Sequence, residues 1–424
     1  MSRLFIPWLV LATTVAWSQE VPSDSPPLTL LQAAKLTLER NPQLRSAPFS
    51  REAAVAELDQ AALNPQWSVD LQVDDFAGTG TYSGFDAGET TLRLSRIFQS
   101  SDIRSGRMSV ASAQGRQIDD QLEVERLDLM ALLARRFLAV VHQQNKLELA
   151  EQSVVVWDNA RQLALLRERA GGAPAVDRLR TEIQLAKARL QVEDADLELQ
   201  AARVSLAATW GDLTPAFGPA DAQLCSLPEL PPFETVAAKL DRNPELLRFA
   251  SEQQLHESRA QLATARRRPG WTLSAGVRRF EQFDDHALVF AVSVPLGSSS
   301  RSVPALRREN ALRQQSELQE QAVRLDIHAT LNEIYQELVN ARTALRIFDD
   351  EILPRATKIL ADIENGFRVG RFLHLELLNA QAELLAARAA RLTVCGDHQL
   401  LLIDIERLTG GGSVWLADRL GATP

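Results

Sequence analysis

The chain carries no combination of nucleophile, base or metal ligands that indicates catalysis, so its candidate chemistry rests on charged side chains. The six histidines show none of the spacings that metal sites use, and we expect lone surface or core residues. The run Gly78-Thr79-Gly80 lies between two predicted strands, where it indicates a flexible loop. The formal net charge of −9 argues against a nucleic-acid partner, which basic patches would favour. We therefore expect no enzyme, no cofactor and no metal site.

Charged residues do fall at regular positions on predicted strands. From Trp67 onward apolar and polar residues alternate, and this period of two indicates a strand with one apolar and one polar face. Similar alternation predicts strands at about 66–76, 89–98, 271–280 and 287–296. The charged residues on the polar faces are Asp70, Asp74, Arg93 and Arg278. If the strands close into a barrel, we expect these side chains to line its lumen.

Long helices that occur twice must position these strands. A shift of 199 positions brings Gly171 onto Gly370 and Gly211 onto Gly410. In each copy a glycine turn opens a helix whose apolar residues step by three and four, the seam spacing of a coiled coil. The predicted seams are Val176, Leu179, Ile183, Ala186, Leu190 and Leu197, and then Leu375, Leu378, Ala382, Leu385, Ala389 and Leu392. The repetition indicates a duplicated unit.

Each copy has the order short helix, strand, strand, long helix, turn, helix. The first repeat spans 19–211, with a helical hairpin at about 101–209, and the second spans 237–410, with a hairpin at about 303–408. A Pro-rich connector, 212–236, separates the two repeats, and a loose tail, 411–424, follows the second. Pro354 lies inside a predicted long helix and should kink it, because proline removes a backbone donor.

The N-terminus indicates export from the cytoplasm. Arg3 precedes an apolar run, and the small residues Ala16 and Ser18 suit cleavage, so residues 1–18 are predicted to be a signal peptide. This run is too short to span a membrane, and no other stretch approaches eighteen consecutive apolar residues. Any membrane attachment of the mature chain is therefore not made by helices.

Cys225 and Cys395 remain after cleavage, and two states are open to them. An oxidising compartment permits a disulfide, but sequence separation does not give the distance between the two Cα atoms. We expect two separate thiols that pack as small hydrophobic side chains, with the disulfide as the alternative.

The strand count requires partners if the strands lie in a membrane. Strands of about ten residues can cross a bilayer at a tilt. Four strands cannot close a barrel, and lipid does not tolerate open sheet edges. Other subunits must therefore complete the sheet, or the strands lie outside a membrane. Three chains, for example, would supply twelve strands, which lies within the range of outer-membrane barrels.

Several short motifs occur in order. Two occur in duplicate, the Arg-Asn-Pro segments at Arg40 and Arg242 and the Pro-x-Trp openings at Pro65 and Pro269. The strongest lies in the second copy, Phe367-Arg368-Val369-Gly370 followed by Leu377-Leu378-Asn379-Ala380-Gln381. In this combination the chain resembles the TolC family of outer-membrane efflux ducts over nearly all of the mature sequence. The resemblance implies a mainly α fold with a transmembrane β-barrel, in which a trimeric twelve-stranded barrel continues into a periplasmic coiled-coil tunnel. It also implies residence in outer-membrane lipid and two partners, a periplasmic adaptor (membrane fusion) protein and an inner-membrane efflux pump.

In that family the hairpin tips dock the adaptor. The docking turn maps onto Val369, Gly370, Arg371 and Phe372 in the second copy, and onto Gly171 and Gly172 in the first. The alternative is structural, because glycine permits the backbone conformation of a tight turn between helices. The two tips differ in sequence, so we expect two inequivalent docking sites per subunit.

The resemblance also implies a gate. Carboxylates six and nine residues beyond the second glycine ring the closed tunnel of the family's best-known duct, and here these positions are Glu376 and Asn379. The first copy has Asp177 and Arg180 at the matching steps, and Arg180 is a candidate partner for a carboxylate. Three copies each of Asp177 and Glu376 would form a negative ring that attracts cations. The alternative is that they are ordinary charges near helix N-termini.

The leading hypothesis is a passive conduit, the outer-membrane part of a tripartite pump. The alternative is a soluble periplasmic coiled-coil scaffold or adaptor whose strands pack in a sandwich. The chain resembles the heavy-metal-exporting branch of the family, and small organic toxins remain open, because the inner-membrane pump largely sets the specificity.

Overall fold

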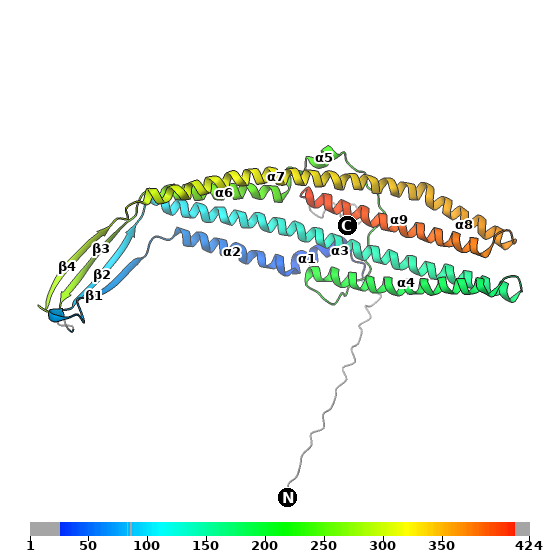
Figure 1. Ribbon diagram of the computed structural model, residues 1–424, viewed down its shortest axis with the longest axis horizontal. Helices are drawn as coiled ribbons and strands as arrows, with labels where there is room; N and C mark the ends of the chain where they lie inside the picture. Colours follow the sequence, from blue (N-terminus) through cyan, green and yellow to red (C-terminus); the bar gives the residue numbers. More distant parts are fainter. Residues whose placement is uncertain (1–25, 83, 85–86, 412–424) are drawn as a thin grey trace, which may run out of the picture.

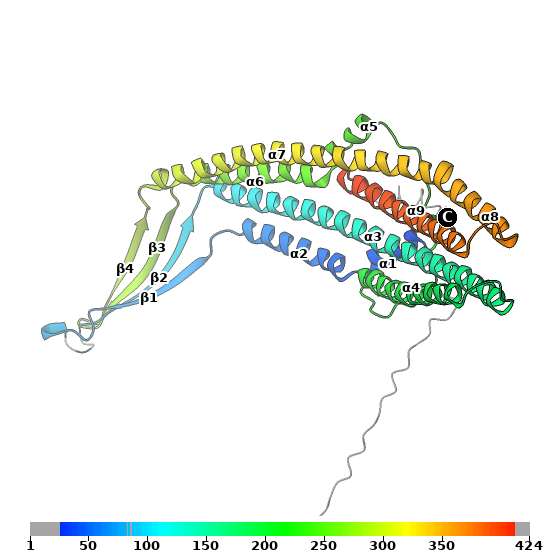
Figure 2. The same cartoon turned by 45° about the vertical axis from the view of Figure 1, so that its right-hand side comes forward.

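The structure is a computed structural model that describes residues 26–82, 84 and 87–411. The predicted signal peptide and the predicted tail after Gly411 lie outside these residues. The described chain is long, with a sheet at one end and the tips of two helical hairpins at the other (Figure 1). A second view shows the same order, with the sheet bending away from the helices (Figure 2).

The order of helices and strands largely repeats in the two halves. The first half contains α1 (Leu30–Arg40), α2 (Pro42–Ala62), β1 (Trp67–Asp74), η1 (Gly80–Tyr82), β2 (Glu89–Phe98), α3 (Ser101–Arg169), α4 (Ala175–Ala207) and η2 (Ala208–Trp210). The second half contains α5 (Phe233–Ala237), η3 (Leu240–Arg242), α6 (Pro244–Ala265), β3 (Trp271–Phe280), β4 (Asp285–Ser293), α7 (Ser298–Ile347), the π-helix η4 (Phe348–Ile352), α8 (Leu353–Arg368) and α9 (His374–Leu408).

The strands form one antiparallel sheet in the order β1-β2-β3-β4. The pairing of β2 with β3 joins the two repeats, which sequence periodicity alone did not predict. Gly276 permits this close pairing, since a Cβ atom there would lie 2.3 Å from the carbonyl oxygen of Leu92. In the described chain β1 and β4 pair on one side only, so the sheet has two open edges.

One face of the sheet exposes large apolar side chains. Cross-strand partners such as Val69 and Leu94, or Ala275 and Phe290, share this face, because directly opposite residues point the same way. Its large exposed side chains include Val69, Leu71, Leu92, Leu94, Val277, Leu288, Phe290 and Val292. Such a face requires an apolar environment or a partner.

The long helices pack through seams that only partly match the predicted ones. In α3, Met130, Ala134, Phe137 and Val141 step by three and four and are buried. Of the seam predicted for α9, Leu378 is buried, Leu385 and Leu392 are half-buried, and Leu375 is exposed. In α4 the prediction was wrong for the single chain, since Val176, Leu179, Ile183, Leu190 and Leu197 are 48–63% exposed. The buried residues of α4 are Thr181, Leu185, Ala188, Ala195, Leu206 and Ala207. The apolar stripe therefore marks a second face of α4 that the described chain leaves uncovered.

The Arg-Asn-Pro segments form equivalent joints in the two halves. The side chain of Asn41 donates to the Thr209 carbonyl at 2.6 Å, and that of Asn243 donates to the Leu408 carbonyl at 2.8 Å. Each asparagine also accepts a backbone N–H of the helix that it opens. One side chain thus caps a helix start and fixes the end of the returning helix beside it.

The second hairpin is interrupted where Pro354 was expected to kink it. The π-helix η4 ends at Ile352, two residues before Pro354, and α8 begins at Leu353. Proline and π-helical turns are both established causes of helix kinks.

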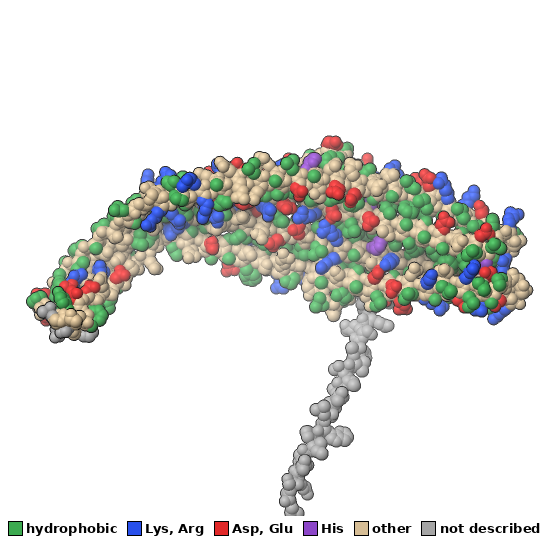
Figure 3. Space-filling view, viewed as in Figure 1, with side chains coloured by type: hydrophobic (Ala, Val, Ile, Leu, Met, Phe, Trp, Pro, Cys, Tyr) green, Lys and Arg blue, Asp and Glu red, His purple; other side chains and the backbone are tan. Residues whose placement is uncertain are grey.

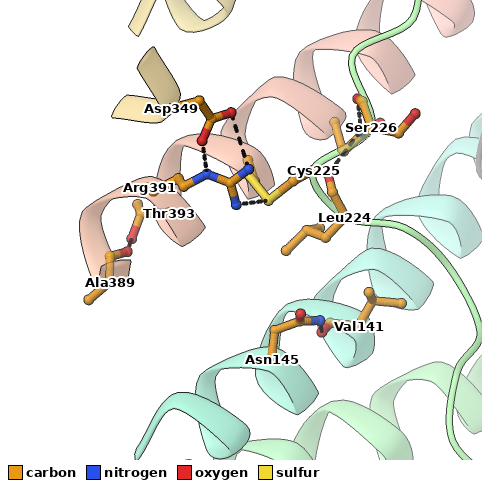
Figure 4. Close-up of a disulfide and its surroundings, with 11 residues drawn as sticks. Val141, Asn145, Leu224, Cys225, Ser226, Asp349, Ala389, Arg391 and Thr393 are labelled. Atoms are coloured by element: carbon orange, nitrogen blue, oxygen red, sulfur yellow. Dashed lines mark hydrogen bonds and ion pairs between the residues drawn. A yellow bond between two sulfur atoms is a disulfide. The ribbon is translucent and has the colours of Figure 1, made fainter. Parts of the chain in front are cut away.

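Cys225 and Cys395 form a disulfide, with a Cα–Cα distance of 4.9 Å across 170 residues of sequence. The expectation of separate thiols was therefore wrong. Gln399 donates to the carbonyls of Leu224 and Ser226 at 3.0 Å, which lays the connector along α9. Arg391 donates to the Cys225 Sγ at 3.2 Å and to Asp349 of η4 at 2.6 Å (Figure 4). The connector, α9 and the π-helix therefore meet at one point.

Candidate functional site at the sheet and the hairpin tips

The charged strand residues predicted to line a lumen share the polar face of the sheet. Asp70 lies opposite Arg93, which in turn lies opposite Gly276 of β3. The Asp70 carboxylate accepts a hydrogen bond from Ser95 at 3.0 Å, and that of Asp74 accepts one from Gln72 at 2.8 Å. The face is therefore polar, and its acidic groups are held by neutral donors.

On the same face Arg278 is held by two acceptors from β2. It donates to the Glu89 carboxylate at 2.6 Å and to the Thr91 hydroxyl at 3.0 Å. Its charge is thus balanced across the strand pair, whereas the buried Nε of Arg93 has no partner among the described residues. Sequence alternation placed these four residues on one face, but it did not indicate which of them would pair.

The two hairpin tips use the same turn. Gly171 and Gly370 have φ angles of 71° and 76°, a left-handed conformation that favours glycine. In the first tip Gly172 N–H donates to the Arg167 carbonyl, and in the second Arg371 N–H donates to the Gly366 carbonyl. These bonds, with those of Gly171 and Gly370, form the Schellman pattern that ends a helix. Both glycines therefore have a structural reason to be present.

The second tip is the more prominent of the two. Val369 is 75% exposed and Arg371 is exposed, so both side chains are open to a partner. Phe372 instead packs over Gly366, where an added Cβ atom would lie 2.3 Å from its ring. In the first tip Gly171 and Gly172 are exposed, and no side chain of comparable size is present in the turn.

The predicted gate residues lie in the first turns of α4 and α9. Arg180, Glu376 and Asn379 are exposed, and Asp177 is half-buried. The Glu376 carboxylate accepts the backbone N–H of Leu373 at 2.7 Å, which caps the start of α9. Near the first tip Arg178 binds Glu168 and Glu182 at 2.7 Å each, whereas Arg180 makes no ion pair within the described chain.

A contact between the two hairpins lies beside these residues, and sequence reasoning did not single it out. Arg167 donates to the Phe367 carbonyl at 2.5 Å, and its guanidinium lies 3.7 Å from the centre of the Phe367 ring. Phe367 is 1% exposed, and its ring also meets the imidazole of His374. We call Arg167, Phe367 and His374 the tip clasp.

His374 connects this clasp to the first-copy gate residues. Burial lowers the pKa of His374, while the nearby carboxylate of Asp177 raises it and Arg167 and Arg180 lower it. Asp177 and Arg180 therefore lie close to the start of α9, although they come from the other repeat. The signal that could have revealed the clasp is the large apolar side chain of Phe367, three residues before the turn glycine.

Two further observations limit the chemistry of the chain. Within the described ranges, no group of three or more histidine, cysteine and carboxylate side chains is arranged to hold a metal ion. None of the helices in the described part of the chain is both long and apolar enough to cross a bilayer.

Comparison with known proteins gives a consistent result. Residues 33–212 and 236–411 match the model of the family described as outer membrane efflux protein. The chain is 27% identical over 427 residues to the cobalt-zinc-cadmium resistance protein CzcC of Cupriavidus metallidurans, covering 97% of this chain and 100% of the relative.

Solved structures show the same fold. A membrane protein from Pseudomonas aeruginosa superposes with a TM-score of 0.74 at 17% identity, covering 96% of this chain and 97% of that one. The open state of the MtrE outer membrane channel of Neisseria gonorrhoeae superposes with a TM-score of 0.71 at 16% identity. This match covers 90% of this chain and 89% of that one. The expected TolC-like fold is thereby confirmed. The chain belongs to the outer membrane efflux protein family, and it is an outer-membrane export duct of a tripartite pump with a large periplasmic part, not an enzyme.

Proposed function

We propose that this duct is a homotrimer that exports divalent metal cations, together with a periplasmic adaptor and an inner-membrane pump. The observation that carries the substrate class is the similarity to CzcC, which extends over nearly the full length of both chains. Small toxic organic compounds are the alternative cargo, because the pump partner largely selects what enters the duct.

The open edges of the sheet support the trimer. Unpaired backbone groups of β1 and β4 are not tolerated in lipid, and three copies supply twelve strands with every edge paired. The exposed apolar stripe of α4 supports the same assembly, since a neighbouring copy would cover it. A purified sample that native mass spectrometry in detergent finds monomeric would contradict this part of the proposal.

Within this trimer the polar face of the sheet lines the lumen. Asp70, Asp74, Arg93 and Arg278 then face the exported solute, while the apolar face meets lipid. The pairing of Arg278 with Glu89 leaves the lumen close to neutral at that level, so it hinders cations less than a free arginine ring would.

The tips carry the adaptor site and the gate. Val369 and Arg371 are the exposed side chains beside Gly370, so the second tip offers the larger adaptor contact. Phe372 shapes this tip from beneath by packing on Gly366. Asp177 and Glu376 supply negative charge at the tunnel end, with Arg180 and Asn379 beside them, and this charge favours cations.

The test of substrate uses a strain that lacks this duct but retains its pump and adaptor. Restoring the wild-type chain should lower the cellular content of zinc, cadmium or cobalt, measured by elemental mass spectrometry after a metal challenge. A strain whose metal content is the same with and without the duct, while an organic dye accumulates only without it, would contradict metal export.

A second test examines the conduit itself. In planar bilayers the purified duct should give channels that are mostly closed and prefer cations over anions. Anion-preferring channels would contradict the proposed negative gate, and protein that fractionates with soluble periplasmic proteins would restore the scaffold alternative.

A further inference from the structure

Arginines gather where the sheet meets the helices. The segments 99–108, 264–270 and 297–308 contain one carboxylate, Asp102, although the whole chain has a net charge of −9. In the space-filling view, basic side chains crowd this junction, while both signs are mixed over the helical part (Figure 3). The eight arginines of these segments, here called the junction arginines, are Arg104, Arg107, Arg266, Arg267, Arg268, Arg301, Arg307 and Arg308.

Three elements bring these arginines together. The start of α3 lies against the end of α6, since a Cβ atom at Gly106 would lie 3.1 Å from the Leu262 side chain. Arg268, just beyond α6, binds Asp102 of α3 at 3.2 Å. The start of α7 enters the same junction from β4 (Figure 1). The charge cluster is therefore a property of the fold, because its members come from three separate segments.

Most of these guanidinium groups have no partner among the residues that the structure describes. Arg107 donates to the Leu63 carbonyl, and Arg308 binds the carboxylate of Glu309. The arginines that make no side-chain hydrogen bond or ion pair with the described residues are Arg104, Arg266, Arg267, Arg301 and Arg307, and all five are exposed. Like charges held close together repel one another unless an anion neutralises them.

Aromatic residues mark the level of a membrane surface beside this cluster. Trp67 and Trp271 begin β1 and β3, and both are partly exposed at the helical end of the sheet. Phe98 ends β2 and stacks on Trp271 with ring centres 4.4 Å apart. Tryptophan is enriched where a bilayer meets water, and outer-membrane barrels carry such rings at both interfaces. The junction arginines begin directly beyond these rings, at the depth of lipid headgroups.

The opposite end of the sheet has the opposite charge. The carboxylates of Asp74, Asp75, Glu281, Asp284 and Asp285 gather there. Arg279 is their local counter-charge, at 3.3 Å from Glu281 and 3.2 Å from Asp284. The excess of positive charge is thus confined to the end that faces the helices, which is the periplasmic side of an outer-membrane duct.

We propose that the junction arginines bind the phosphate groups of anionic phospholipids in the periplasmic leaflet of the outer membrane. The guanidinium group forms two parallel hydrogen bonds with a phosphate, and five of these groups are free to do so. The bound lipids neutralise the cluster and hold the sheet at a fixed depth. This inference rests on the outer-membrane location of the duct and is independent of what the duct exports.

The test compares lipid stabilisation of matched variants of the full chain. One variant carries Arg266→Gln, Arg267→Gln and Arg268→Gln, and the control carries Arg169→Gln, Arg368→Gln and Arg371→Gln at the hairpin tips. Both variants lose three exposed arginines. The detergent-purified proteins are heated with phosphatidylglycerol or with zwitterionic phosphatidylcholine, and native mass spectrometry counts the bound lipids.

Phosphatidylglycerol should raise the melting temperature of the wild type and the tip control by several degrees more than phosphatidylcholine does. The junction variant should lose at least half of this difference and retain fewer phosphatidylglycerol molecules. Equal stabilisation of both variants would overturn the proposal, and so would equal effects of the two lipids on the wild type. Stabilisation by inorganic phosphate alone that matches the effect of phosphatidylglycerol would assign the cluster to a free anion and overturn the lipid proposal.

Discussion

The two helical hairpins derive from one repeat but differ in how rigidly they are built. In the first, α3 runs for 69 residues without interruption into a turn of small residues. In the second, η4 interrupts the helix before Pro354, and Arg391 connects this interruption to the disulfide of the connector. We infer that the first hairpin is the stiffer of the two, and that the outer part of the second is the one whose angle can change.

At the tips, unlike residues at equivalent positions make a contact between the hairpins. The shift of 199 places Arg167 opposite Gly366 and Glu168 opposite Phe367. Arg167 reaches from the first hairpin to Phe367 in the second, while Gly366 leaves room for Phe372. The repeat therefore supplies the scaffold, and a departure from the repeat supplies this contact at the tips.

The largest effect should come from removing the clasp. Phe367→Ala empties a fully buried site, which typically costs about 3–5 kcal/mol, and it also removes the ring that Arg167 covers. We expect channels in planar bilayers to be open far more often. The control Glu168→Ala is the equivalent change in the first hairpin, and breaking its bridge to Arg178 should cost about 1 kcal/mol or less. Channels that are open equally often in both variants would show that the two hairpins do not differ at these equivalent positions.

Removing the disulfide should cause the next largest loss of stability, and this loss should be confined to the second half of the chain. Replacing both Cys225 and Cys395 by serine should lower the stability by about 2–5 kcal/mol, because the bridge restrains a long loop of the unfolded chain. Melting curves with and without a reductant measure this change. The wild type should lose stability on reduction, and the double variant should not respond. Proteolysis of the connector should increase in both reduced samples.

A pH dependence should distinguish α9 from α4. Burial raises the pKa of Glu406 to about 8, against the effect of Lys239, and lowers the pKa of His398 to about 4, with Arg342 contributing. For Glu406, stability should fall as the pH rises from about 4.5 to about 8, because the folded chain favours the protonated acid. For His398, stability should fall as the pH drops from 6.5 to about 4, because the folded chain favours the neutral ring.

The equivalent positions of α4 carry Leu199 and Ala207, which do not titrate. Melting temperatures across this pH range should therefore flatten on the alkaline side in Glu406→Gln and on the acidic side in His398→Leu. Unchanged slopes in both variants would mean that other groups dominate the pH response.

The smallest change in stability should come from the turn glycines, where the comparison of the tips is most direct. Gly171→Gln and Gly370→Gln each force a side chain into a left-handed backbone, which costs about 1–2 kcal/mol. A Cβ atom at either position would meet nothing within 4 Å, so the two variants are equally strained. Efflux should fall more for Gly370→Gln, because Val369 and Arg371 are exposed beside it. Equal losses of efflux, measured by cellular metal content, would mean that the tips are interchangeable.

Local patterns in the sequence predicted much of this molecule. The period of two located the strands and placed Asp70, Asp74, Arg93 and Arg278 on one face, because successive strand residues point to opposite sides. The repeated glycines located both tips, since their left-handed φ angles are a local requirement. Pro354 predicted an interruption of the second hairpin, because the missing backbone donor of a proline is also a local property. The π-helix η4 is this interruption.

Contacts between distant segments depended on the tertiary structure. An apolar stripe does not show what covers it, and the stripe of α4, predicted to be a coiled-coil seam, is exposed in the single chain. The disulfide joins cysteines 170 residues apart, and the clasp joins Arg167 to Phe367 across 200 residues. The repeated elements, their faces and their turns could thus be predicted from the sequence, because these follow from local geometry. Which faces meet was decided only by folding, because it depends on how the two repeats are placed against each other.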